Sequence, residues 1–170
     1  MRALFISALL LLLAPVVSAQ PFSSAEYGYA ADFPCTPEEQ RDPGQRVNGQ
    51  LVSDSATVAC QTENQYFVGM SVDRYYTGAH PTLESIRDAY LRGFNGSGGR
   101  SASATIGGHS ALLFTFQSNA NPNATGRGMV VFVDGQPSRY YTVVLVRGPN
   151  TTPEALAVAD HFLDSFRVLH

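Results

Sequence analysis

The chain has no lysine and no tryptophan, and only 15% of its 170 residues are charged. All eleven basic residues are arginines. Without a lysine amine, the chain cannot carry out Schiff-base catalysis, attach pyridoxal phosphate or build a Walker-type phosphate loop. No other cofactor motif is present, and we expect no cofactor.

Basic runs are also missing, and the formal net charge is −3. This balance argues against nucleic acid or an anionic membrane surface as the partner. Hydrophobic residues make up 44% of the chain, which is too many for a disordered protein. The length suits one domain with one core.

The longest apolar run, residues 3–13, stands directly behind Met1 and Arg2. It is too short to span a bilayer, and small residues at Val17 and Ala19 follow it. This pattern predicts a cleavable secretory signal over residues 1–19 and a mature domain over 20–170, secreted or periplasmic, with no membrane span after cleavage. A buried amino-terminal helix is the alternative.

Cysteine is scarce as well, with Cys35 and Cys60 as the only pair. In an oxidising compartment such a pair forms a disulfide, which here would close a loop of about 26 residues. We expect it to fasten the amino-terminal segment to a sheet. A redox-active pair is the alternative, but the spacing is not the Cys-x-x-Cys of a reactive thiol.

Several segments alternate or are rich in β-forming residues, and they predict strands. They are residues 27–33, 46–53, 56–60, 66–72, 102–117, 126–134 and 138–147. Because Pro34, Pro37 and Pro43 interrupt the chain, we expect turns after the first strand. The last strand is apolar on both sides, so both of its faces should be covered. Residues 134–137 should join the last two strands as a hairpin.

Two segments have helical spacing of apolar residues, 82–94 and the segment that begins at Thr152-Pro153-Glu154. The glycine-rich residues 95–100 between the first helix and the next strand favour a loop, with an anion cradle as the alternative. One inserted helix, one carboxy-terminal helix and a mostly antiparallel sheet define an α+β layered domain.

Two short sequence segments, one at each end of the predicted mature chain, are similar to those of a known family. They are residues 26–34, Glu-Tyr-Gly-Tyr-Ala-Ala-Asp-Phe-Pro, with Thr36-Pro37 just after, and residues 161–167, His-Phe-Leu-Asp-Ser-Phe-Arg. The chain resembles the PsbP-like superfamily of small exported domains, and the predicted helices and strands fall in the family's order. The resemblance implies an αβα sandwich. Photosynthetic members are extrinsic subunits of photosystem II, other relatives bind proteins, and many bacterial envelope members have no assigned activity. The family offers no shared catalytic residue to transfer, and the lipid-attachment cysteine of some bacterial relatives is missing here.

The residues from Gly107 to Ser110 are the segment that most resembles an enzyme motif. Gly108-His109-Ser110 begins like the nucleophile elbow of serine hydrolases, with Asp134 or Asp160 and His161 as conceivable partners. Leu112, however, stands where the elbow needs its second glycine. A small hydrolase, or a ligand- or metal-binding protein using this turn, is therefore the alternative function.

The four histidines lack the close pairing of a metal site, so we expect no metal ligands. Tyrosine pairs such as Tyr75-Tyr76 suit either a binding surface or the edge of a core. We expect a non-enzymatic exported domain that binds a protein or an envelope component. Tyr75, Tyr76 and Arg139 are candidates for that surface, but the sequence does not fix the binding residues.

Overall fold

The computed structural model describes residues 19–62, 66–78 and 80–169, so the predicted signal segment lies outside the described residues except for Ala19. The strands and helices follow in the order β1 (Gln20–Ser24), β2 (Tyr29–Phe33), β3 (Glu38–Val47), β4 (Gln50–Gln61), β5 (Tyr66–Tyr75), α1 (Leu83–Gly93), β6 (Gly96–Ile106), β7 (His109–Ser118), β8 (Thr125–Val133), β9 (Ser138–Arg147), α2 (Pro153–Ser165) and β10 (Arg167–Val168). Within the described part of the chain, no helix is long and apolar enough to cross a membrane.

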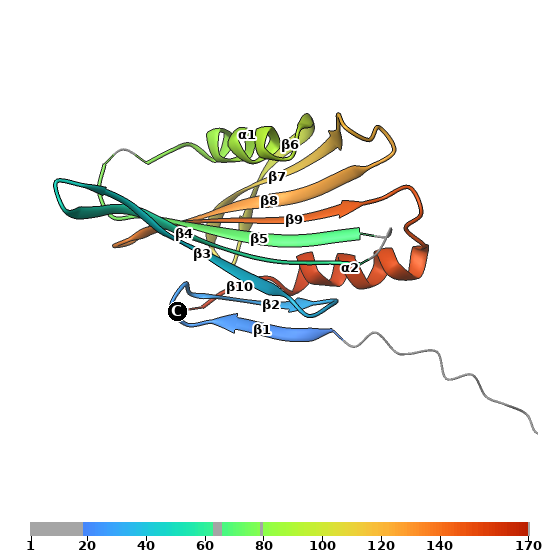
Figure 1. Ribbon diagram of the computed structural model, residues 1–170, viewed down its shortest axis with the longest axis horizontal. Coiled ribbons are helices and arrows are strands. Elements are labelled where there is room, and N and C mark those ends of the chain that lie inside the picture. The colour runs from blue at the N-terminus through green and yellow to red at the C-terminus, as the bar shows by residue number, and fades with distance from the viewer. Residues whose placement is uncertain (1–18, 63–65, 79, 170) are drawn as a thin grey trace, which may run out of the picture.

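Seven strands form one antiparallel sheet in the order β3-β4-β5-β9-β8-β7-β6. A smaller sheet has the order β1-β2-β10. Figure 1 shows α1 on one face of the large sheet, with α2 and the small sheet on the other. The predicted α+β architecture, with one inserted and one carboxy-terminal helix, is confirmed.

Each helix begins with a threonine at its amino-terminal cap. The Thr82 side chain accepts a hydrogen bond from the backbone N–H of Ser85, and Thr152 does the same for Ala155. Pro153 occupies the first helical position of α2, where its missing N–H costs nothing. These caps fix where each helix starts over the sheet.

Strand β9 lies at the centre of the large sheet and is buried on both faces, as predicted. Tyr141 and Val143 belong to the core on the α2 side, whereas Tyr140 and Val144 belong to the core beneath α1. The turn at residues 134–137 joins β8 to β9 as an antiparallel hairpin, also as predicted.

The prediction of a loop over residues 95–100 is wrong, because β6 begins at Gly96. The predicted single strand over 102–117 is in fact parts of two strands, β6 and β7, joined at Gly107 and Gly108, whose φ angles are 57° and 84°. Glycine adopts such angles without strain, so it favours a tight hairpin here. Gly96, Gly98 and Gly99 are tolerated within β6 because it is an exposed edge strand, and its register with β7 shifts between Gly98 and Ser101.

The proline-interrupted stretch expected to contain turns also holds a strand, β3. It pairs with β4 at the opposite edge of the sheet, and its register shifts between Asp42 and Gln45, around Pro43. An edge strand tolerates proline because it need not donate every N–H to a neighbour. The strand β1 and the two-residue strand β10 were not predicted. Both form by pairing with β2, and their own sequences have no strand pattern.

The small sheet is attached to the β3-β4-β5 half of the large sheet. The structure joins Cys35, just after β2, to Cys60 on β4. Arg74 on β5 lies 4.2 Å above the Tyr27 ring and donates from Nε to Asp54 at 2.6 Å. The hydroxyl of Tyr141 donates to the carbonyl oxygen of Tyr27 at 2.7 Å. The disulfide and the Arg74–Tyr27 contact therefore join the small sheet to this half, and the Tyr141 hydrogen bond joins it to the central strand β9.

Candidate functional site

Helix α2 covers only part of its face of the large sheet. It packs against β2, β5 and β9, while on the same face of β7 and β8 the side chains of Leu113, Thr115 and Arg127 remain exposed. Two adjoining cavities, of about 530 and 660 Å³, follow the flank of α2 and share Thr115 and Arg127 in their walls. We call the two together the groove.

One end of the groove is apolar. Its wall includes side chains from β6, β7, β8 and the end of α2, namely Ala102, Ile106, Leu113, Met129, Leu163 and Phe166. Leu113 is 40% exposed, although it lies between paired strands in the sheet. An exposed leucine in a concave apolar surface is a favourable contact for a ligand, because its burial removes apolar area from water.

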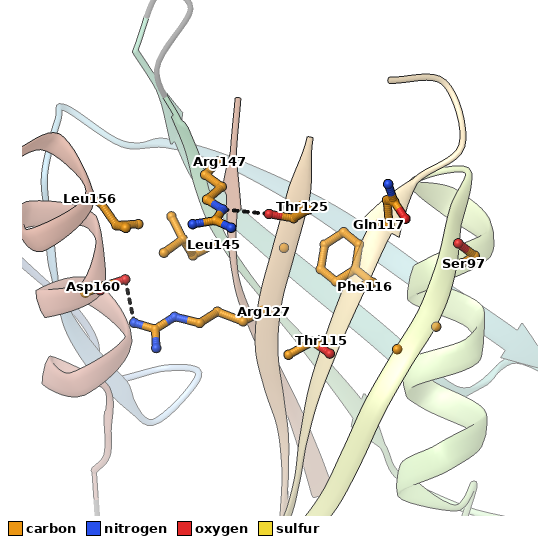
Figure 2. A pocket seen from close by; sticks show the side chains of 13 residues that line it. Ser97, Thr115, Phe116, Gln117, Thr125, Arg127, Leu145, Arg147, Leu156 and Asp160 are labelled. Carbon is orange, nitrogen blue, oxygen red and sulfur yellow. Dashed lines mark hydrogen bonds and ion pairs between the residues drawn. The ribbon is translucent and has the colours of Figure 1, made fainter. Parts of the chain in front are cut away.

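The other end of the groove is polar and rich in arginine. Figure 2 shows Arg127 reaching from β8 to Asp160 on α2, where their charged atoms are 2.5 Å apart. The Nε of Arg147 donates to the Thr125 hydroxyl at 2.6 Å. Because Arg127 and Asp160 are both partly exposed, their ion pair contributes no more than about 1 kcal/mol to stability. The pair can therefore reorganise around a ligand at little cost.

Two of the groove arginines, Arg100 and Arg147, lack an acidic partner among the described residues. Within residues 19–62, 66–78 and 80–169, neither Arg100 nor Arg147 forms an ion pair. Their guanidinium groups keep N–H donors for a carboxylate or another oxygen-rich group. The groove thus combines an apolar surface with cationic hydrogen-bond donors, an arrangement suited to binding.

The residues from Gly107 to Ser110 do not form a nucleophile elbow. Gly107 and Gly108 make the β6-β7 hairpin turn, and Ser110 is an exposed β7 residue paired with Thr105. A hydrolase elbow joins a strand to a helix, and here the turn joins two strands. Asp134 lies after β8, and the His161 ring nitrogen is 3.3 Å from Asp32 on β2. The structure does not assemble these residues into the expected hydrolase geometry.

In the part of the chain that the structure describes, no three His, Cys, Asp or Glu side chains are grouped to hold a metal ion. His80 contacts the buried Ser138 hydroxyl at 3.0 Å, and His161 contacts Asp32. The Ser138 hydroxyl is fully buried, so the Ser138–His80 pair cannot present a nucleophile to a substrate.

The three residues suggested for a binding surface have structural contacts. Tyr75 packs edge-to-face on Tyr140, with ring centroids 5.6 Å apart, and the Tyr76 hydroxyl donates to Asp54 at 3.1 Å. Burial raises the pKa of both tyrosines. Arg139 fills the space beside Gly28, where a Cβ atom would collide with its guanidinium group. None of the three lines the groove, and their part in binding stays a prediction.

Sequence reasoning missed the groove, although one signal for it was present. Along β7 the side chains of Leu112, Phe114 and Phe116 share one face, and Thr115 and Gln117 lie on the other. This alternation indicates a strand with one core face and one polar face. It does not reveal that α2 lies to the side of β7, which depends on long-range packing.

No family model matches the chain, and no curated protein matches it either. Among solved structures, it is similar to LpqN of Mycobacterium tuberculosis, a protein described as involved in cell envelope biogenesis. That match has 13% identity and a TM-score of 0.53 over 88% of this chain and 90% of LpqN.

The solution structure of the cyanobacterial PsbP of Synechocystis sp. PCC 6803 matches at 14% identity and a TM-score of 0.49, over 90% of this chain and 94% of that one. The match to LpqN shows a shared fold, and the layered α+β architecture that the two end segments implied is the one observed. At these identities the likeness extends to the fold alone.

Proposed function

We propose that this protein is an exported binding domain of the cell envelope, and that it engages a protein or another envelope component in the groove beside α2. The observation that carries the proposal is the open α2-side face of β6, β7 and β8, with Leu113 exposed at its centre. Concave apolar surfaces with a few fixed polar groups are where proteins bind ligands.

Three further observations support export and a role in the envelope. Residues 1–19 have the composition of a cleavable signal, and Cys35 and Cys60 are positioned for a disulfide, which persists in oxidising compartments. The structurally similar LpqN is described as involved in cell envelope biogenesis. The polar lining of the groove supports binding, since Arg100, Arg127 and Arg147 supply cationic hydrogen-bond donors there.

Site-specific photo-crosslinking in the producing cells tests the proposal. A benzoylphenylalanine at position 113 places the reactive group in the groove, and the same residue at position 47 is the matched control. Val47 is 50% exposed and lies at the end of β3, on the opposite edge of the sheet. We expect a discrete covalent adduct from position 113 and none from position 47.

Filling the groove sharpens the test. Ala102→Phe adds a ring to the apolar wall without changing a buried core residue, and it should abolish the adduct from position 113. The absence of any adduct from position 113, or equal adducts from both positions, would contradict binding in the groove.

A further inference from the structure

The backbone of β6 presents hydrogen-bonding groups along the outer edge of the sheet. In a hairpin with a two-residue turn, the residues that flank the turn form a hydrogen-bonded pair, and hydrogen-bonded and non-hydrogen-bonded pairs then alternate. Here Ile106 and His109 flank Gly107-Gly108. The N–H and C=O groups of Ser101, Ser103 and Thr105 therefore point away from β7, toward solvent.

The opposite edge is protected against pairing, whereas β6 is not. Strand β3 carries Glu38, Glu39, Arg41 and Asp42, and its register is broken twice around residues 42–46. Charges, prolines and bulges at an edge discourage a further strand. From Ser101 to Ile106, β6 has no charge and no proline, and its register with β7 is regular.

The groove lies directly beside this edge. Ala102 and Ile106 of β6 are in its apolar wall, next to Leu113 of the neighbouring strand. Side chains of a strand alternate between the two faces, so an additional strand alongside β6 would direct every second side chain toward the groove. Apolar residues at those positions would cover Leu113.

Charge adds a second requirement for the occupant. Arg100 lies at the β6 bulge and lines the same cavity, and it forms no ion pair within residues 19–62, 66–78 and 80–169. An acidic side chain in the alternating set would provide the missing carboxylate. Asp164 at the far wall disfavours a second acidic group there.

From these features we infer that β6 is a docking edge for an extended segment of a partner polypeptide. The segment pairs with Ser101, Ser103 and Thr105 through its backbone, places alternate apolar side chains in the groove, and pairs one acidic side chain with Arg100. This mode adds a strand to a sheet, with affinity from backbone hydrogen bonds and specificity from alternate side chains. The inference rests on the proposed function and names its partner class.

Fluorescence polarisation with synthetic peptides tests the inference on the protein purified after export. The probes are the capped peptide Thr-Val-Thr-Val-Thr-Glu-Thr and its reversed sequence, because the added strand can run in either direction. We expect saturable binding of one of them and at least tenfold weaker binding when its Glu is replaced by Lys. Arg100→Gln should remove the preference for Glu over Lys.

The backbone is tested with a matched pair of variants. Ser103→Pro removes an outward N–H without removing a bond to β7, whereas Ser103→Ala keeps that N–H. We expect Ser103→Pro to weaken probe binding at least tenfold and Ser103→Ala to leave it unchanged. If Ser103→Pro fails to fold, N-methylation of alternate amides of the probe gives the same test, since one alternating set should abolish binding and the other should not.

Three results would overturn the inference. One is no saturable binding of either probe, and another is equal affinity for Ser103→Pro and Ser103→Ala in folded proteins. The third is a concentration-dependent dimer in sedimentation that Ser103→Pro abolishes, without probe binding, because the occupant would then be a second copy of the chain. A groove adduct from position 113 together with any of these results leaves the proposed function standing and removes only the strand-addition mode.

Discussion

The two halves of the seven-stranded sheet differ in what covers and cross-links them. The β3-β4-β5 half is joined to the small sheet by the Cys35–Cys60 disulfide and by Arg74, which contacts both Tyr27 and Asp54. On the β6-β7-β8 half, helix α1 covers one face, and the other face holds the groove. The contrast separates residues that hold the fold together from residues that remain accessible.

This difference makes opposite predictions for the two halves. Substitutions in the β3-β4-β5 half should change the free energy of unfolding and leave the chemistry of the groove intact. Exposed substitutions in the groove should leave stability nearly unchanged and alter binding. Stability and binding are separated in this way because a binding surface must keep apolar area in contact with water until its ligand arrives. Residues of such a surface therefore contribute little to the stability of the free protein.

The largest effect is expected from Arg74→Met. The Arg74 and Asp54 side chains are only 13% and 9% exposed, so the substitution leaves a carboxylate buried without its partner. We expect a loss of about 4 kcal/mol in the free energy of unfolding, measured by urea denaturation. The double variant Arg74→Met/Asp54→Leu should recover much of that loss, and failure of the second substitution to help would show that the ion pair is not the cause.

Replacing the disulfide should have the next largest effect. The Cys35→Ala/Cys60→Ala variant loses the constraint on a loop of about 26 residues in the unfolded chain, which corresponds to about 3.5 kcal/mol. Urea denaturation in the presence and absence of a thiol reductant measures the difference. Reduction should destabilise the parent protein by a similar amount and leave the variant unchanged. A parent protein indifferent to reductant would contradict the stabilising role of the bond.

Asp73 on β5 predicts a pH-dependent effect. Burial raises its pKa to about 6, so the folded protein favours the protonated carboxyl. The resulting stability is present below about pH 4, the pKa of an unfolded aspartate, and is lost as the pH rises through 6. Asp73→Asn should therefore stabilise the protein by about 2 kcal/mol at pH 8 and have little effect at pH 4.

Thermal denaturation at the two pH values measures this effect. The exposed Asp42, which is in the same half of the sheet, gives the control variant Asp42→Asn. That variant should show no comparable gain at pH 8. Equal gains for the two variants would point to net charge instead of the burial of Asp73 as the cause.

Local sequence signals predicted the elements that carry strong periodicity or caps. Thr82, Thr152 and the doubly apolar stretch 138–147 led to α1, α2 and β9 because each signal is contained within a few residues. The first part of β6 was missed because Gly96, Gly98 and Gly99 have no intrinsic preference for a strand, and the pairing of Gly96 and Gly98 with β7 is not visible in the local sequence. The groove could not be predicted either, since it exists only where α2 stops short of β6, β7 and β8.

The smallest effect on stability, and the sharpest separation of the two halves, is expected from Leu113→Gln. This side chain is already partly exposed, so the free energy of unfolding should change by no more than about 0.5 kcal/mol. With benzoylphenylalanine at position 102, the variant should lose most of the groove adduct, because it replaces the exposed apolar contact with an amide. Val47→Gln, on the opposite edge, should be equally stable and keep the adduct. If both variants retain it, Leu113 is not a contact, and binding depends on the arginine end of the groove.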